Sequence, residues 1–242
     1  MIVLKHLASI GLVAASSLGF TAVDMASGVA IGEAFHIKTG ELLYTETHRK
    51  PSEYTHLVTY REATGNIFAE KTIHYVHSLL APDFDQMNQR NGEVIKVKAV
   101  DKDNLSVTYK ASYGQKEKTK PIEVTNRLIV DAGFDHYVRA HWDKLIKGET
   151  MKVAFLAPTR QITVPFRIVK TDCKDSDSSV SAICLLLSPN SWFFRLVVDP
   201  IYLVYDNESK NLQRYLGRGN ISEKNGDYLT VDIHYRYETP LS

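Results

Sequence analysis

The chain has 242 residues, of which 44% are hydrophobic and 24% are charged, and its formal net charge is +1. This balance is typical of a globular protein with a sizeable core. A net charge so close to zero gives no whole-chain basis for binding nucleic acid or an anionic membrane surface, so neither partner is expected. Because the sequence contains no internal repeat, low-complexity run or linker, we expect one β-rich domain over residues 29–242.

Residues 1–28 have the order of a secretory signal peptide. Lys5 gives a charged start, an apolar stretch covers residues 7–23, and small residues follow up to Gly28. The alternative is an N-terminal membrane anchor. Asp24 and the short apolar run argue against it, because a membrane span needs ~20 apolar residues. We therefore expect export, cleavage near Gly28, and a mature protein without a membrane span.

Two cysteines, Cys173 and Cys184, flank a stretch that begins polar and turn-prone. In an exported protein this arrangement most simply forms a disulfide. Closing so short a loop stabilises a fold by ~3 kcal/mol in the chain-entropy model. The alternative is a catalytic thiol, but there is no Cys-X-X-Cys motif and no neighbouring feature that would activate a thiolate. We expect a structural disulfide.

Most of the mature chain alternates between apolar and polar residues, as β-strands do. Local turns join these runs, which indicates an antiparallel meander of roughly 11 or 12 strands rather than parallel βαβ units. Residues 78–92 are expected to form a surface loop and residues 115–120 a basic turn. Pro165 cannot donate to a strand ladder, so it predicts an edge strand or a bulge. The expected strands cover residues 34–37, 41–47, 54–61, 67–76, 93–100, 105–111, 151–157, 161–171, 182–187, 201–205, 212–217 and 228–237.

One amphipathic helix, over residues 131–147, interrupts the strands. Its apolar residues recur at helical spacing and form a single stripe. The stripe consists of Phe134, Val138, Trp142 and Leu145. Gly148 follows as the expected end of the helix, since glycine enters the left-handed conformation without a Cβ clash.

A single helix among strands must pack on them, and two architectures allow this. A closed barrel would remove all sheet edges. A strongly curved open sheet would instead use the helix to cover its concave face. The position of the helix in the middle of the strands favours the second. We expect a mainly β fold, with a single curved antiparallel sheet or half-barrel carrying one amphipathic helix against its concave face.

No compact catalytic or metal-binding motif is present. The chain lacks Gly-X-Ser-X-Gly, a phosphate loop and a dinucleotide fingerprint. His74 and His77 lie three apart on a strand and would face opposite sides. His136 and His141 would lie ~140° apart around the helix. We expect no enzymatic activity, metal or cofactor, although a site assembled from distant strands stays open.

A second apolar feature lies at residues 192–198, which carry more large apolar side chains than one stripe of a short helix can bury. Burial in the core is the common outcome for such a run. The alternatives are that Trp192, Phe193 and Phe194 rim an apolar cavity, or that they contact a membrane or a partner.

Three segments, residues 81–85, 130–145 and 191–201, together resemble a family of uncharacterised exported proteins of Gram-negative bacteria. The resemblance spans most of the mature chain and implies a periplasmic location, but no established activity. In strand order and composition the chain is also similar to the half-barrel proteins of lipoprotein localisation. In those proteins a curved antiparallel sheet with a helical lid holds acyl chains. The sequence has no N-terminal lipid-attachment cysteine, which implies a carrier or sensor rather than an anchored acceptor.

We therefore expect a periplasmic binding or carrier protein for an apolar ligand, such as a lipid or a lipoprotein acyl chain. Its expected ligand-binding residues are Phe134, Val138, Trp142, Leu145, Trp192, Phe193 and Phe194. The alternative is an envelope protein–protein interaction or assembly module without a ligand cavity, and an enzyme of unrecognised type comes last. The helix distinguishes the first two. A stripe that fills the concave face acts as a plug and removes most of the basis for a ligand. Space beneath the stripe makes the helix a lid, with Trp142 and residues 192–194 facing the same cavity.

Overall fold

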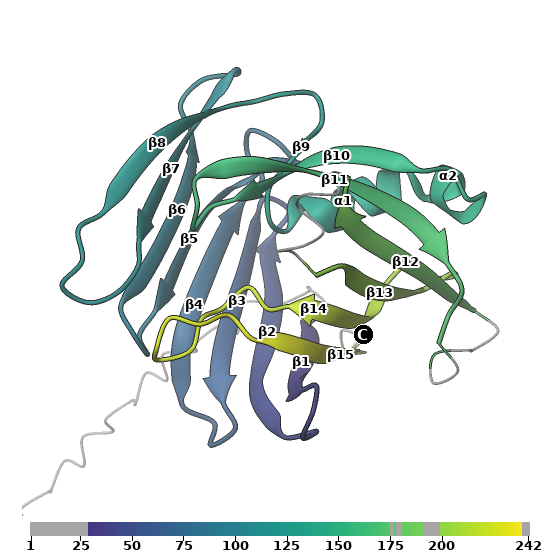
Figure 1. The fold of residues 1–242 in the computed structure, drawn as a ribbon, viewed down its shortest axis with the longest axis horizontal. Coiled ribbons are helices and arrows are strands. Elements are labelled where there is room, and N and C mark those ends of the chain that lie inside the picture. Colours follow the sequence, from purple (N-terminus) through teal and green to yellow (C-terminus); the bar gives the residue numbers. More distant parts are fainter. Residues whose placement is uncertain (1–28, 175–176, 178–180, 191–198, 239–242) are drawn as a thin grey trace, which may run out of the picture.

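The computed structural model describes residues 29–174, 177, 181–190 and 199–238. These residues form one sheet of fifteen strands and two short helices (Figure 1). The first eight strands are β1 (Val29–His36), β2 (Leu42–Ser52), β3 (Thr55–Glu62), β4 (Ile67–His74), β5 (Asp83–Asn88), β6 (Glu93–Ala99), β7 (Asn104–Lys110) and β8 (Lys118–Glu123). The remaining elements are β9 (Leu128–Ile129), α1 (Gly133–Ala140), α2 (Trp142–Ile146), β10 (Met151–Ala157), β11 (Ile162–Thr171), β12 (Ala182–Pro189), β13 (Ile201–Asp206), β14 (Leu212–Arg218) and β15 (Thr230–Glu238).

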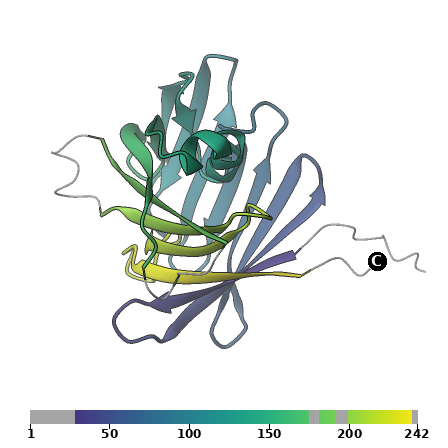
Figure 2. The same ribbon diagram turned by 90° about the vertical axis from the view of Figure 1, so that its right-hand side faces the viewer.

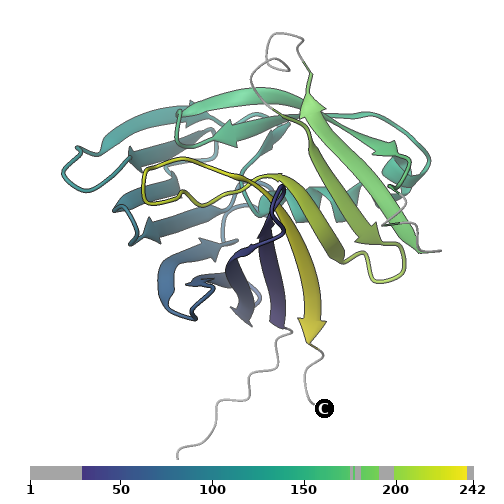
Figure 3. The same ribbon diagram turned by 60° about the horizontal axis from the view of Figure 1, so that its bottom comes forward.

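The sheet is a meander in which the first and last strands meet. β1 pairs antiparallel with β15, and from there the order runs to β8 on one side and to β9 on the other. Among the described strands, only the short contact between β9 and β10 is parallel. β8 and β9 follow each other in the sequence but form the two edges. The sheet therefore curls round without closing (Figure 3).

The expectation of a mainly β fold with one curved open sheet is confirmed, but the number of strands is fifteen rather than roughly eleven. The expected loop over residues 78–92 contains β5. Its inward positions include the buried polar residues Gln86 and Asn88, so apolar and polar residues do not alternate along this strand. The expected basic turn over residues 115–120 leads into β8, an edge strand with no buried residue.

A side chain rather than a strand bridges part of the opening. Gln161 lies at the turn between β10 and β11 with a φ of 53°. Its Nε2 donates hydrogen bonds to the carbonyl oxygens of Val107 and Lys118, both at 2.7 Å. The tip of the β10–β11 hairpin is thus fixed to β7 and β8. The outer edge of β8 carries Lys120 and Pro121, residue types that discourage pairing with another chain.

The expectation that Pro165 marks an edge is wrong. β11 lies between β10 and β12, and Pro165 pairs with Ala154 of β10. Its carbonyl accepts a hydrogen bond at 2.8 Å from the amide of Asn190, one residue beyond the end of β12. Proline is tolerated inside the sheet because it lies where the neighbouring strand has just ended.

The expected single helix is two helices, because the chain leaves helical geometry at His141 (φ −111°, ψ 19°). The His141 ring donates through Nδ1 to the carbonyl of Tyr137 at 2.9 Å and so competes with the backbone. Gly148 ends the segment with a φ of 87°, as expected. Figure 2 shows both helices within the curve of the sheet. In the part of the chain that the structure describes, no helix is long and apolar enough to cross a membrane.

Two large apolar clusters form the core. The first lies mainly between β1–β7, β15 and the loops that cover them, and the second joins the helices to β10–β13. The Tyr215 side chain on β14 packs against both. The expected disulfide between Cys173 and Cys184 is confirmed, with a Cα–Cα distance of 5.2 Å. It ties the chain after β11 to β12.

Candidate functional site

The stripe on the helices packs against the sheet as a plug. Val138 and Leu145 are fully buried, and Trp142 is 4% exposed. The Trp142 ring meets the ring of Tyr205 edge to face, with centroids 5.8 Å apart. Phe134 is half-buried beside Phe155, with ring centroids 5.7 Å apart. Trp192, Phe193 and Phe194, the other expected ligand-binding residues, lie outside the described residues.

The wall beneath the stripe is apolar. β10 to β13 contribute its side chains, which belong to the same core cluster as the stripe. They are Val153, Val164, Phe166, Ile168, Leu185, Leu187, Leu203 and Tyr205. The helices therefore cover this apolar wall.

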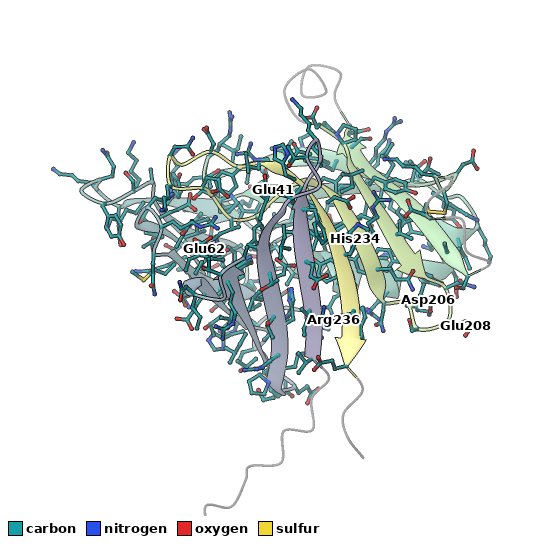
Figure 4. The ribbon with its side chains drawn as sticks, turned by 90° about the horizontal axis from the view of Figure 1, so that it is seen from below. Glu41, Glu62, Asp206, Glu208, His234 and Arg236 are labelled. Carbon is teal, nitrogen blue, oxygen red and sulfur yellow. A yellow bond between two sulfur atoms is a disulfide. The ribbon has the colours of Figure 1, made fainter. Side chains whose placement is uncertain are left out.

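Beside the helix start, the inner face of the sheet carries a buried polar group that sequence reasoning did not identify. We call Glu46, His48, His56 and Tyr235 the Glu46 network. On β15, His234 and Arg236 lie on the outer face (Figure 4), so Tyr235 between them points inward. Gly32 of β1 lies between Glu46 and Tyr235 in register, and a Cβ there would come within 2.8 Å of both side chains. Glycine therefore allows these two side chains to meet.

The network is a chain of hydrogen bonds. Glu46 Oε1 accepts from the hydroxyl of Tyr235 at 2.5 Å and from Nε2 of His48 at 3.0 Å. His48 Nδ1 lies 3.0 Å from His56 Nε2. Burial alone would raise the pKa of Glu46, but the hydrogen bond and charge of His48, the hydrogen bond from Tyr235 and the charge of Lys71 outweigh it and lower the pKa. Glu46 is therefore ionised and only accepts hydrogen bonds.

His56 is held neutral. Burial, followed by the positive charges of His48, Lys50 and Lys71, lowers the pKa of His56 to about 3. When His48 is also neutral, its Nε2–H donates to Glu46, so its Nδ1 must accept from His56 Nε2–H. His56 Nδ1 then carries a lone pair and points away from His48. The three side chains form a relay with an acceptor at its far end.

Two atoms of this network lack a hydrogen-bond partner among the described residues: Glu46 Oε2 and His56 Nδ1, both buried. An unmet buried polar group costs ~1–3 kcal/mol, and more when it is charged. Lys71, whose side chain is 1% exposed, makes no hydrogen bond to either atom; its Nζ lies 2.6 Å from Asp131 Oδ2 instead. Asp131 comes shortly before α1, so this ion pair also fixes the helix start to β4.

A second buried carboxylate, Glu93, has a complete set of partners. We call Glu93 and the side chains around it (Asn88, Asn91, Tyr109, Ser222 and Tyr228) the Glu93 network. Glu93 accepts from the hydroxyls of Tyr228 at 2.7 Å, Ser222 at 2.9 Å and Tyr109 at 3.3 Å. Ser222 Oγ in turn accepts from both asparagine side chains. This network fixes the loop over residues 219–229 to the sheet.

An open groove of about 940 Å³ lies at the outer end of this loop, between the turns after β3 and β5. Arg90 crosses it, forks onto Glu62 at 2.7 and 2.5 Å, contacts Glu223 at 2.9 Å and stacks 3.5 Å above the Phe68 ring. These contacts occupy the guanidinium. No member of the Glu46 network lines the groove, so the groove and the incomplete polar group are separate features.

The Glu46 network is not arranged as a metal site. Within residues 29–238, apart from the undescribed segments, no three His, Cys, Asp or Glu side chains are placed to hold a metal ion. Both nitrogens of His48 are already used in hydrogen bonds. The arrangement can bind a hydrogen-bond donor or pass a proton along the relay.

No family model and no curated protein matches the sequence. The fold is similar to the crystal structure of a beta-barrel-like protein of domain of unknown function DUF1849 from Brucella abortus, with a TM-score of 0.55 and 8% sequence identity. The match covers 90% of this chain and 98% of that chain. At this identity the likeness shows the fold alone. It agrees with the expected resemblance to uncharacterised proteins of Gram-negative bacteria.

Proposed function

We propose that the protein is a periplasmic binding or carrier protein that holds an apolar ligand, such as a lipid or a lipoprotein acyl chain, on the concave face of its sheet. The observation that carries this proposal is the apolar wall of β10–β13, which an amphipathic helix covers. In the described arrangement the stripe takes the place that an apolar chain would take. The disulfide is in keeping with an oxidising, extracytoplasmic compartment.

Few polar contacts hold the helices down, and one of them joins α2 to β11, where Lys170 Nζ donates to the carbonyl of Ile146 at 3.2 Å. Lys71–Asp131 fixes their start. Arg139 reaches the β13–β14 turn, where it contacts the carbonyl of Ser209 at 3.4 Å and the side chain of Asn211 at 3.2 Å. The break at His141 separates α2 from α1. The stripe could therefore leave the wall while Asp131 keeps its ion pair.

The apolar contacts set the length of chain that could replace the stripe. Burying a side chain of this size stabilises by ~1.5–3 kcal/mol, so the three buried stripe residues contribute about 5–9 kcal/mol. A methylene group contributes ~0.8 kcal/mol, so about 6–11 methylenes match the stripe. We expect long chains to bind and short ones to leave the helices in place.

Trp142 provides the test. The chain has two tryptophans, so Trp192→Phe leaves Trp142 as the reporter on the stripe. Decanol added to the purified exported protein should shift Trp142 emission to the red as the ring leaves the wall, whereas butanol at the same concentration should not. No shift with either alcohol, together with no lipid extracted from the protein, would defeat the proposal.

Export has its own test. N-terminal sequencing of the exported protein should find a start near residue 29, where the described strand β1 begins. An intact Met1 on the exported protein would contradict cleavage of a signal peptide.

The burial of the stripe favours a second candidate, an envelope interaction or assembly module without a ligand cavity. Large apolar side chains are exposed next to each other at the end of the β3–β4 pair. Tyr54 is 53% exposed and Val76 67% exposed, and the amide of Tyr75 bonds to the carbonyl of Tyr54. For this candidate, Val76→Asp should leave stability unchanged but remove a partner in a pull-down, and chains of any length should fail to bind.

A further inference from the structure

We propose that the Glu46 network is a headgroup site. It would take the hydrogen-bond-donating end, an ammonium or a hydroxyl group, of an amphiphile whose chain replaces the helix stripe. This inference rests on the proposed function and names the class of ligand.

The first argument is the missing partner of Glu46. The residue is 1% exposed and its Oε2 has no hydrogen-bond partner among the described residues. Tyr235 and His48 both donate to the other oxygen, Oε1. Because a carboxylate only accepts, the group that completes this site must be a donor.

The second argument is the other open end of the relay. His56 Nδ1 is buried and has no partner among the described side chains. In the tautomer in which His56 Nε2–H donates to His48, this nitrogen also accepts. A primary ammonium carries three donors and a hydroxyl one donor, so either group satisfies acceptors of this kind. A carboxylate or phosphate diester offers no donor.

The third argument is charge. Lys71, the cation beside Glu46, is already paired with Asp131. Glu46, Asp131 and Lys71 together carry one net negative charge, and His56 is neutral. An anionic headgroup would add a like charge in a buried site, whereas an ammonium would neutralise it.

The fourth argument is position. Lys71, whose charge acts on Glu46, pairs with Asp131 just before the start of α1. Tyr215 is half-buried and its ring packs on both core clusters, and desolvation and the charges of Glu46 and Asp131 raise its pKa above the ordinary value. The network therefore lies where the second apolar cluster begins. A headgroup here leaves its chain directed along the wall of β10–β13.

The Glu93 network shows what completes a carboxylate on this sheet. There, Ser222 Oγ of the 219–229 loop donates to Glu93 Oε2 at 2.9 Å. Glu46 has no such hydroxyl at its Oε2 within the described structure. The ligand would supply at Glu46 the donor that the chain itself supplies at Glu93.

The test compares three probes with the same chain and different ends: decylamine, decanol and decanoate. Each is titrated below its micelle-forming concentration against the delipidated exported protein, with Trp142 emission as the readout in the Trp192→Phe background. The amine and the alcohol should bind at least about tenfold more tightly than decanoate, which corresponds to one charge-assisted hydrogen bond. Glu46→Gln should remove most of the preference for the amine.

Two further variants keep the test decisive. His56→Gln retains a group that can bond to His48 but removes the acceptor at Nδ1, so it should weaken binding of the amine and the alcohol without affecting decanoate. Glu93→Gln alters the other buried carboxylate, and the preference among the three probes should persist.

The outcomes separate the two proposals. If the three probes bind equally tightly to the wild type and to Glu46→Gln, the headgroup site is overturned. The proposal that the protein carries apolar chains would then stand. Tighter binding of decanoate would also overturn the site. Binding of none of the probes would defeat the carrier function and the headgroup site together.

Discussion

Glu46 and Glu93 lie on one row across the inner face of the sheet. The pairing register runs from Glu46 to Tyr60, then through Ala69 and Asn88 to Glu93. Both carboxylates are almost fully buried and both accept from tyrosine hydroxyls. A loop of the chain completes the Glu93 network, whereas Glu46 keeps an oxygen without a partner among the described residues. The same chemistry thus serves two purposes. A closed network fixes a loop, and an open one marks a place for a donor from outside the chain.

The largest effect should follow from opening the closed network. Glu93→Ala would leave the hydroxyls of Tyr109, Tyr228 and Ser222 buried without their acceptor. We expect a loss of ~3 kcal/mol or more in the free energy of unfolding, measured with urea. Glu33→Ala, which removes the exposed ion pair between Glu33 and Arg236 on the outer face, is the matched control and should cost less than ~1 kcal/mol. Equal losses would show that the Glu93 network is not a fixed structural unit.

The next effect should come from crowding the open network. In Gly32→Ala the new methyl group would lie within 2.8 Å of the Glu46 and Tyr235 side chains and separate them. We expect a loss of ~1–3 kcal/mol, as for other overpacked sites. In the Gly32→Ala variant, the second change Tyr235→Phe should lower the thermal unfolding temperature less than it does in the wild type. The reason is that the hydrogen bond between Tyr235 and Glu46 would already be broken. If the two changes lower the unfolding temperature additively, the space at Gly32 is not what allows Glu46 and Tyr235 to meet.

The two networks should also differ in their response to acid. The folded-state pKa of His56 is about 3, below its ordinary value of 6.5. Below pH 6.5 the unfolded chain binds a proton that the folded chain does not, so the stabilising effect of neutral His56 is lost as the pH falls from 6.5 towards 3. His56→Gln should reduce the slope of the unfolding free energy against pH over this window. The hydrogen-bond partners of Glu93 include no histidine, so Glu93→Gln should keep the slope of the wild type. An unchanged slope in His56→Gln would contradict the burial of a neutral His56.

The smallest effect should follow from neutralising the open carboxylate. Glu46→Gln keeps an acceptor for Tyr235 and His48 and removes a buried charge whose second oxygen is unpaired. The loss of charge-assisted bonds and the relief of desolvation oppose each other, so we expect a change of no more than ~1 kcal/mol in unfolding free energy. Glu93→Gln should cost more, because its new amide would face Ser222 Oγ, which already accepts two hydrogen bonds. The reverse order would show that Glu46 is the better satisfied carboxylate.

The spacing of apolar residues along the sequence predicted the fold correctly in those segments whose inward-facing side chains are apolar. The helix stripe and its end at Gly148 follow from spacing and from glycine's freedom at positive φ. β5 was missed because Gln86 and Asn88 point inward, and their partners lie more than a hundred residues away in the 219–229 loop. β8 was missed because, as an exposed edge, it buries nothing.

The Glu46 network left a weaker signal in the sequence. His56 alternates with Val58 and Tyr60 along β3 and so lies on the face that these two residues bury. Nothing local, however, brings Tyr235 to Glu46, since that contact depends on the pairing of the first and last strands. Asp131 has an ordinary explanation at a helix start, and its actual partner is Lys71 on β4.

Native mass spectrometry of the exported protein, released without detergent, tests the central claim most directly. The account predicts that the wild type carries a long-chain amphiphile with an amine or hydroxyl headgroup. Glu46→Gln should lose this ligand, and Glu93→Gln should retain it. A wild-type protein that carries no such ligand and takes up none of the three decyl probes would contradict the claim that the open network and the apolar wall form one binding site.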